Sequence, residues 1–331
     1  MKHVFFIIIL TIILIGCNDQ VTDIYDIDSE KQYLSLEHSL SWSPDNSMLV
    51  YVSNNMIIIK DAKTGSIRPL TGTGFYDEPS WSPDSKKIAY TVVPYGARSD
   101  IWIKNADGSG IATRLTSDLA AEYHPRWSPD GKLISFHSYR KKSMDIWVRN
   151  SDGSGEDRVI ASDTAVDQNA EWSPDSSMLV FESKRSGNFD IWIARADGSG
   201  SPIQITTNSS DDTKPLWSPD GKKIAFISNR FGITSVWCKN SDGTGDDINI
   251  TEGYAKVGSF NWSPDSKWII FESERKIIVR SSDATGTTLE IGQGLEPCWS
   301  PDGTRIAFIS WEGSQYTIKI IEVSESIKVI Q

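Results

Sequence analysis

The stretch Trp217-Ser218-Pro219-Asp220-Gly221 decides the fold, because its first four residues recur along the chain. Trp-Ser-Pro-Asp begins at Trp42, Trp81, Trp127, Trp172, Trp217, Trp262 and Trp299. The intervals between these tryptophans run from 37 to 46 residues. A period near 40 to 45 residues is the length of one four-stranded sheet in a radially closed all-β fold.

One repeat shows how the unit is built. Residues 213–217 and 222–228 are predicted strands, and the Ser-Pro-Asp-Gly between them has the residue order of a type I turn. The second strand has an almost continuous apolar centre, which is typical of a sheet covered on both faces. Third and fourth strands are predicted at 235–239 and 247–251, and Asp242-Gly243 between them favours a tight hairpin.

The seven repeats predict an all-β protein, a seven-bladed β-propeller of four-stranded antiparallel blades over residues 37–331. An isolated sheet of this kind cannot bury both faces, whereas a closed ring of sheets can. The repeated tryptophans then fill the gaps between neighbouring blades. The last blade is predicted to be complete, with its fourth strand at 327–330.

The first residues have the form of an export signal. Lys2 precedes an apolar run over residues 4–15, which is shorter than the roughly 20 residues that span a bilayer. The run ends in Leu14-Ile15-Gly16-Cys17, which resembles the lipobox of bacterial lipoproteins. That resemblance implies a lipoprotein signal peptide at 1–16, a lipidated Cys17, an acidic tether at 17–36 and an extracytoplasmic, membrane-anchored protein. An ordinary cleaved signal with an incidental cysteine is the alternative.

Charge and cysteine content exclude two classes of protein. The formal net charge is −11, and loss of Lys2 with the signal would leave 32 basic against 44 acidic residues. Such a surface repels phosphate backbones, so no nucleic acid partner is expected. Cys238 and Cys298 fall in different repeats and are expected to be small buried residues outside any disulfide framework.

The repeat resembles that of the TolB-type propellers, which also occurs in the propeller domains of prolyl oligopeptidase relatives. The resemblance covers some 290 residues, from about His38 to the end of the sequence. It implies a non-catalytic scaffold whose partner is an envelope protein or a peptidoglycan-associated lipoprotein. TolB carries an α/β domain before its propeller, whereas about 20 residues separate Cys17 from the first blade here. We therefore expect the chain to lack that domain, and we likewise expect no hydrolase domain.

Function is expected on the face that carries the longer loops, because loops tolerate variation. The loop between the second and third strands is shortened in the first and sixth repeats, so Trp311 and Tyr316 of the seventh should stand above their neighbours. Aromatic residues and arginine are enriched in interfaces. The predicted partner-binding residues are therefore Trp311, Tyr316, Tyr139, Arg140, Arg185 and Arg230. Alternatively, the arginines form structural ion pairs with Asp100, Asp145 and Asp190.

A second candidate surface is the mouth of the central channel. The residues three places before each tryptophan are Ser39, Glu78, His124, Asn169, Lys214, Ser259 and Glu296. Glu78, His124, Lys214 and Glu296 are the candidate ligand-binding residues of this ring. A solvated channel lining is the alternative, since every propeller must line its hole.

Sequence motifs give little support for an enzyme. Beyond the signal, the histidines are His38, His124 and His137, and no zinc-protease, serine-nucleophile or phosphate-loop motif is present. No metal or cofactor is expected. The leading hypothesis is an envelope scaffold that binds its partner on the longer-loop face. The alternative is a carbohydrate- or peptide-acting enzyme, or a ligand sensor, with its site at the channel mouth.

Overall fold

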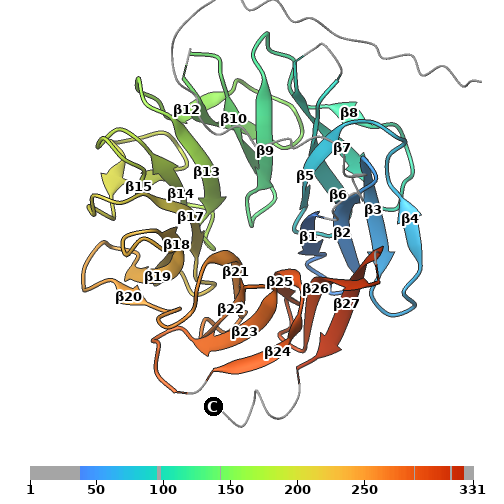
Figure 1. Ribbon diagram of the computed structural model, residues 1–331. Helices are drawn as coiled ribbons and strands as arrows, with labels where there is room; N and C mark the ends of the chain where they lie inside the picture. The colour runs from blue at the N-terminus through green and yellow to red at the C-terminus, as the bar shows by residue number, and fades with distance from the viewer. Residues whose placement is uncertain (1–37, 95–97, 142, 287, 314, 324–331) are drawn as a thin grey trace, which may run out of the picture. The chain divides into compact units, whose positions relative to one another are not determined.

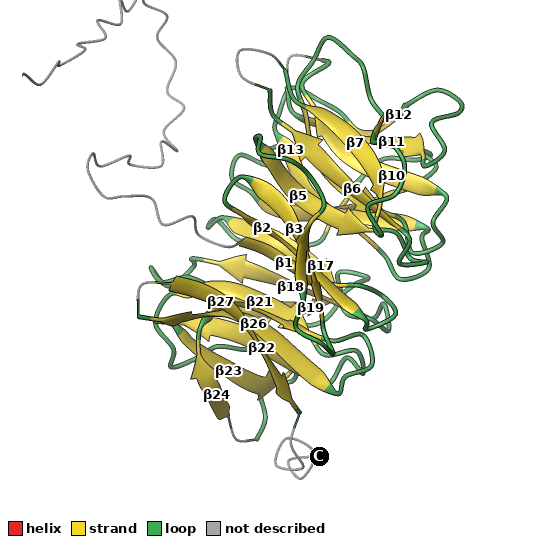
Figure 2. Cartoon of the chain, turned by 90° about the vertical axis from the view of Figure 1, so that its right-hand side faces the viewer, coloured by secondary structure: helices red, strands yellow, loops and turns green. Residues whose placement is uncertain are grey.

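The computed structural model describes residues 38–94, 98–141, 143–286, 288–313 and 315–323, and every regular element among them is a β-strand. The strands form seven antiparallel sheets around a common centre (Figure 1). Figure 2 shows the same sheets from the side, connected only by loops. The predicted all-β, seven-bladed propeller is confirmed. No helix in the described part of the chain could cross a membrane.

Blades follow one another in chain order. Blade 1 contains β1 (His38–Trp42), β2 (Met48–Ser53), β3 (Met56–Asp61) and β4 (Ile67–Pro69). Blade 2 contains β5 (Tyr76–Trp81), β6 (Lys87–Val92), β7 (Asp100–Asn105) and β8 (Thr113–Arg114). Blade 3 contains β9 (Glu122–Trp127), β10 (Leu133–Ser138), β11 (Asp145–Asn150) and β12 (Arg158–Ala161). Blade 4 contains β13 (Asp167–Trp172), β14 (Met178–Ser183), β15 (Asp190–Arg195) and β16 (Ile203–Gln204).

The remaining blades repeat this order. Blade 5 contains β17 (Asp212–Trp217), β18 (Lys223–Ser228), β19 (Ser235–Asn240) and β20 (Ile248–Asn249). Blade 6 contains β21 (Val257–Trp262), β22 (Trp268–Ser273), β23 (Lys276–Ser281) and β24 (Leu289–Gln293). Three strands of blade 7 are described: β25 (Leu295–Trp299), β26 (Arg305–Glu312) and β27 (Gln315–Glu322). The fourth strand predicted at 327–330 lies outside the described residues, as do the predicted signal peptide, Cys17 and the tether.

Each Ser-Pro-Asp turn is held by its own side chains. In blade 5 the Gly221 amide donates to the Ser218 carbonyl oxygen at 2.8 Å, which closes the predicted turn. The Ser218 hydroxyl donates to Asp220 at 2.7 Å and accepts from the Lys223 amide at 2.9 Å. The residue after the aspartate has a positive φ, +72° at Gly221, so this position favours glycine or a residue that tolerates the left-handed region.

The core consists of seven hydrophobic clusters, one between each pair of neighbouring blades. Phenylalanines at one position of the second strand are fully buried in five blades: Phe136, Phe181, Phe226, Phe271 and Phe308. Cys238 and Cys298 are buried and free of disulfides, as expected. Because the blades share their cores, no sheet is buried by its own residues alone.

The ring closes by packing between blades 1 and 7. Trp42 Nε1 donates to the Cys298 carbonyl oxygen at 3.4 Å, and the Asp302 amide donates to Asn46 Oδ1 at 2.9 Å. Blades 1 and 7 are each built from consecutive strands. Among the described residues, neither end of the chain therefore contributes a strand to the blade formed by the other end.

The second and third strands of blade 7 differ from the prediction. Trp311 and Tyr316 were expected in a loop between these strands, but β26 continues to Glu312 and β27 begins at Gln315. Trp311 and Tyr316 are directly opposite each other in this extended hairpin. Gly313, with φ +62°, supplies the left-handed residue that a short turn requires. The predicted shortening in blades 1 and 6 is confirmed, since two residues join β2 to β3 and two join β22 to β23.

Candidate functional site

Every inner strand carries a β-bulge near its start, which turns one residue out of the regular pleat. The bulged residues with positive φ, between 48° and 60°, are Ser39, Glu78, His124, Asn169, Lys214 and Glu296. These are six of the seven residues predicted to surround the channel mouth. A left-handed conformation costs free energy for a residue other than glycine, so the bulge must be held by its surroundings.

Side chains of the preceding blade hold several of these bulges. The His124 amide donates to Glu78 Oε2 at 2.6 Å, and the Lys214 amide donates to Glu182 Oε2 at 2.6 Å. The Leu40 amide donates to Glu296 Oε2 at 3.3 Å across the closure of the ring. Glu78 and Glu296 therefore have a structural role beside any role in binding.

Four charged side chains of blades 2, 3 and 4 form one cluster at the centre of the ring. His124 Nδ1 lies 3.1 Å from Glu78 Oε1, and His124 Nε2 lies 3.6 Å from Glu171 Oε1. Arg126 Nε donates to Glu171 Oε1 at 2.8 Å. We call Glu78, His124, Arg126 and Glu171 the charged cluster. It pairs two carboxylates with two cations, so its charges balance when His124 is protonated.

Opposite charges within the cluster favour the ionised form of each member. Burial opposes ionisation of Glu78, but His124 and Arg126 outweigh it and hold the pKa of Glu78 at about 2. Burial and the Arg126 charge disfavour a charged His124, but Glu171 and Glu78 prevail and raise its pKa above the usual value. Burial also opposes ionisation of Glu171, whose pKa is nevertheless lowered, mainly by Arg126.

His137 packs beneath the charged cluster and stays neutral. Its ring stacks on that of His124, with centroids 4.7 Å apart and planes 15° from parallel. Its Nε2 accepts a hydrogen bond from the Ala170 amide at 3.3 Å, which requires an unprotonated nitrogen. Burial, together with the neighbouring charge of His124, lowers the pKa of His137 well below its usual value.

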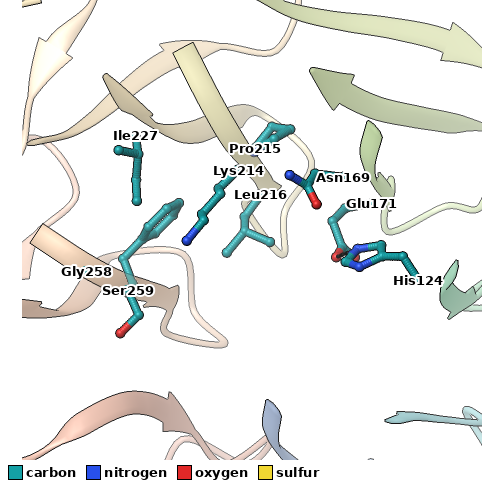
Figure 3. Close-up of a pocket in the computed structure, with 10 residues that line it drawn as sticks. His124, Asn169, Glu171, Lys214, Pro215, Leu216, Ile227, Gly258 and Ser259 are labelled. Atoms are coloured by element: carbon teal, nitrogen blue, oxygen red, sulfur yellow. Dashed lines mark ion pairs between the residues drawn. The ribbon is translucent and has the colours of Figure 1, made fainter. Parts of the chain in front are cut away.

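A pocket of about 260 Å³ opens beside the charged cluster, between the inner strands of blades 3 to 6. Figure 3 shows His124 and Glu171 on one side of it and Lys214 on the other, with Asn169 between them. The apolar wall is formed by Pro215, Leu216, Ile227 and Phe260. We call this space the central pocket. It brings His124 and Lys214 together, whereas Glu296 belongs to blade 7 and does not line it.

Three predicted partner-binding arginines lie in internal ion pairs. Arg185 donates to Asp167 at 2.7 Å and packs on Trp192, and Arg230 donates to Asp212 at 3.0 Å and packs on Trp237. Arg140 repeats this arrangement with Glu122 and Trp147. Their side chains are 8% to 14% exposed. The alternative of structural ion pairs therefore applies, but with other carboxylates than predicted. The carboxylates that bind these arginines begin the first strand of each blade, whereas Asp100, Asp145 and Asp190 begin the third.

Trp311 and Tyr316 are half-buried on the hairpin of blade 7. The Arg275 guanidinium lies 5.2 Å from the centroid of the Trp311 ring. Arg275 belongs to the short turn of blade 6, so the neighbouring blade covers part of the residue that was expected to stand free. Tyr316 packs against the cluster between blades 7 and 1.

The largest group of exposed apolar side chains on the longer-loop face is on blades 2 and 3, at Phe75, Val93, Leu119 and Tyr139, which are 36% to 81% exposed. We call these four residues the loop-face patch. Backbone hydrogen bonds join the loops in two pairs, from Val93 to Phe75 at 2.8 Å and from Tyr139 to Ala121 at 3.3 Å, and a bond from Glu122 to Ser99 at 2.9 Å connects the pairs. Only Tyr139 was predicted from the sequence. The other three were missed because single apolar residues in loops have no periodic pattern.

Among the described residues, no three His, Cys, Asp or Glu side chains are grouped so as to hold a metal ion. His124 and His137 are adjacent, but one is engaged by two glutamates and the other by a backbone amide.

The sequence of this chain matches a known protein family. Residues 22–170 and 125–329 match the family model described as TolB beta propeller domain. A Tol-Pal system protein TolB from Anaeromyxobacter dehalogenans is 49% identical over 47 residues, which are 14% of this chain and 10% of that protein. The chain thus matches about a tenth of the length of that curated relative.

Solved structures show the same fold. TolB from Acinetobacter baumannii aligns with a TM-score of 0.56 at 23% identity, covering 77% of this chain and 63% of that one. An oligogalacturonate lyase from Vibrio parahaemolyticus aligns with a TM-score of 0.67 at 16% identity, covering 86% and 89%. These likenesses establish the architecture alone. Since the family model matches most of the sequence, the chain belongs to the TolB beta propeller domain family.

Proposed function

We propose that the protein is a non-catalytic scaffold of the cell envelope that binds a protein partner on its longer-loop face. The partner is an envelope protein or a peptidoglycan-associated lipoprotein, and Cys17 carries the lipid that holds the scaffold at the membrane. Membership of the TolB beta propeller domain family supports a scaffold, and the name of the Anaeromyxobacter relative supports an association with the Tol-Pal system.

The loop-face patch is the observation that carries the proposal. Leu119 is 81% exposed, and Phe75 and Tyr139 are about half exposed, on adjacent loops of one face. Exposed apolar side chains gathered on neighbouring loops are typical of a protein interaction site. Aromatic residues in such a group commonly dominate the binding energy. The contacting surface of the partner is therefore expected to be apolar at its centre.

The arginines contribute by holding the loops in place. Each of Arg140, Arg185 and Arg230 ties the loop after the second strand to a carboxylate at the start of the first strand. A loop fixed in this way loses little conformational entropy on binding, which favours affinity. Trp311 and Tyr316 on blade 7 are a second contact that the partner can reach on the same face.

The chemistry of the charged cluster supports a non-catalytic role. A general acid or base works best with a pKa near the working pH. Glu78 and Glu171 have lowered pKa values and are paired with cations, His124 with its raised pKa is paired with both glutamates, and His137 is buried and neutral. Structural ion pairing accounts for these residues without a reaction.

Photo-crosslinking in intact cells tests the proposal. A crosslinking amino acid at Leu119 should capture a discrete partner, whereas one at Ile111 should not. Ile111 is a matched control because it is 93% exposed but follows the tight hairpin after β7, on the opposite face. Capture at Ile111 and not at Leu119 would refute the choice of face.

A further inference from the structure

The central pocket is lined by both polar and apolar side chains. Lys214 and Ser259 line it from the inner strands β17 and β21 of neighbouring blades, and the apolar side chains of Leu216 and Phe260 line it from the same two strands. Its volume of about 260 Å³ corresponds to only eight or nine water molecules at about 30 Å³ each. The space therefore fits a small ligand or one terminal residue of a longer one.

The hydrogen-bonding groups that are left over in this pocket belong to Ser259 and Lys214. The Ser259 hydroxyl is buried and makes no hydrogen bond with the described residues, whereas His124 Nε2 already faces Glu171. The Lys214 side chain is exposed; no ion pair or hydrogen bond of its ammonium is found among the described residues, and its charge acts on Glu182. A buried hydroxyl normally has a partner, so Ser259 calls for one from outside, and the nearby ammonium favours an anionic acceptor.

The acceptors around the pocket are already engaged. Glu171 binds Arg126, and Glu182 accepts from Gln168 at 2.7 Å, from Asn169 at 2.8 Å and from the Lys214 amide. Glu272 lies beside Gly258 of the lining and accepts from the Arg275 amide at 3.0 Å. Each of these three carboxylates thus already accepts a hydrogen bond, whereas an anion would find the ammonium of Lys214.

The surrounding charges limit how much negative charge the ligand can carry. Glu171 lines the pocket, Glu182 lies behind it, and the whole chain has a formal charge of −11. Repulsion from fixed negative charges doubles for a dianion such as a phosphate monoester, while a carboxylate carries a single charge. The apolar wall in turn requires an apolar group next to that charge.

We propose that the central pocket binds a monocarboxylate with a small apolar side group, its carboxylate at Lys214 and Ser259 and its apolar group against Leu216 and Phe260. This chemistry has two sources, a free carboxylic acid or the C-terminal residue of a polypeptide. The site is distinct from the loop-face patch and does not depend on the proposed partner.

Calorimetric titration of the full chain tests the site with four probes: N-acetyl-leucine, a hexapeptide ending in leucine, the same peptide with an amidated C-terminus, and methyl phosphate. We expect N-acetyl-leucine to bind and both methyl phosphate and the amidated peptide to fail. Equal affinity for N-acetyl-leucine and the free peptide identifies a small-molecule site. Binding of the free peptide at least tenfold more tightly identifies a polypeptide C-terminus.

Two variants assign the contacts. Lys214→Met keeps the aliphatic stem and removes the charge, and it should weaken binding of N-acetyl-leucine at least tenfold. Ser259→Ala should weaken it several-fold. Lys222→Met is the matched control, since that lysine belongs to the same blade but lies at the Ser-Pro-Asp turn with its side chain 81% exposed. Absence of carboxylate binding, tighter binding of methyl phosphate, or equal affinity in a folded Lys214→Met protein would each overturn the proposal.

Discussion

The indole nitrogen of Trp172 donates a 3.0 Å hydrogen bond to the carbonyl oxygen of Arg126 in the preceding blade. Trp42, Trp81 and Trp262 make the same contact, at 3.3 to 3.4 Å. The indole nitrogens of Trp127, Trp217 and Trp299 are buried without a partner among the described residues. The seven repeats therefore fall into two kinds, although their tryptophans stand at the same position.

The residue after each Ser-Pro-Asp follows the same division. Where the tryptophan donates, that residue is Asn46, Ser85, Ser176 or Ser266, whose side chain accepts from the backbone amide of an aspartate in the preceding blade. Where it does not, the residue is Gly131, Gly221 or Gly303, which lies near a proline of the preceding turn. Blade interfaces with two additional hydrogen bonds thus occur beside interfaces without them.

Tryptophan substitutions should reflect this difference. Trp172→Ala should lower the free energy of unfolding by about 3 to 5 kcal/mol, the usual cost of removing a core aromatic side chain. Trp217→Ala should cost about 1 kcal/mol less, because no hydrogen bond of the indole is lost. Urea unfolding followed by far-ultraviolet circular dichroism measures both. Trp311→Ala should change the midpoint least, and a larger loss there than at Trp172 would contradict the assignment of structural tryptophans.

A missing contact can be supplied at the interface between blades 4 and 5. Gly221→Asn should place an amide oxygen near the Asp175 amide, as Asn46 does for Asp302. Asparagine tolerates the positive φ of this position, so a stabilisation of about 0.5 to 1 kcal/mol is expected. Gly221→Ala is the control, because it has no acceptor and is strained at φ +72°. Equal unfolding free energies for the two variants would show that the added hydrogen bond does not form.

The charged cluster should make stability depend on pH in two directions. Glu78 has a folded pKa of about 2 against an ordinary 4.5, so its contribution is complete above pH 4.5 and is lost as pH falls toward 2. His124 has a raised pKa in the folded state, with Glu78, Glu171, Arg126 and His137 around it. Its contribution is complete below the unfolded value of 6.5 and is lost as pH rises through the folded pKa.

The contribution of His124 to the free energy of unfolding is measured by comparing His124→Gln with the parent protein. The difference in unfolding free energy should be largest between about pH 4.5 and 6.5 and should shrink above that range. His137 titrates in both proteins, and its pKa should be lowered less in the variant, because the charge of His124 contributes to that lowering. A difference that does not vary between pH 5 and 9 would mean that His124 is not ionised in the folded protein.

The predicted lipid anchor is tested at Cys17. Acyl chains hold a protein at a membrane because each buried CH₂ contributes about 0.8 kcal/mol. Cys17→Ser should move the protein from the membrane fraction to a soluble or unprocessed form, while the neighbouring substitution Asn18→Ser should not. Fractionation followed by mass spectrometry of the N-terminus distinguishes these outcomes. Unchanged processing and membrane attachment of Cys17→Ser would eliminate the lipoprotein.

The repeat predicted the fold because it fixes the turn residues and the spacing of strands at every blade. It also located the bulged ring, since the position three residues before each tryptophan is geometrically equivalent in all blades. It did not predict the charged cluster, because the prediction used only the position three residues before each tryptophan, whereas Arg126 and Glu171 are one position before Trp127 and Trp172. No residue pattern marks a bulge built from glutamate, histidine or lysine, and the contacts of these side chains with the neighbouring blade depend on that bulge.

The central claim is that the loop-face patch holds the partner, and quantitative co-purification from crosslinked cells tests it most directly. The double variant Phe75→Ser, Leu119→Ser removes the apolar surface, and Ile111→Ser, Ile203→Ser is its matched control on exposed residues elsewhere. Both proteins should unfold like the parent, since all four side chains are more than half exposed. We predict that recovery of the partner falls at least tenfold for the patch variant and stays unchanged for the control. Full recovery with a folded patch variant would contradict the account.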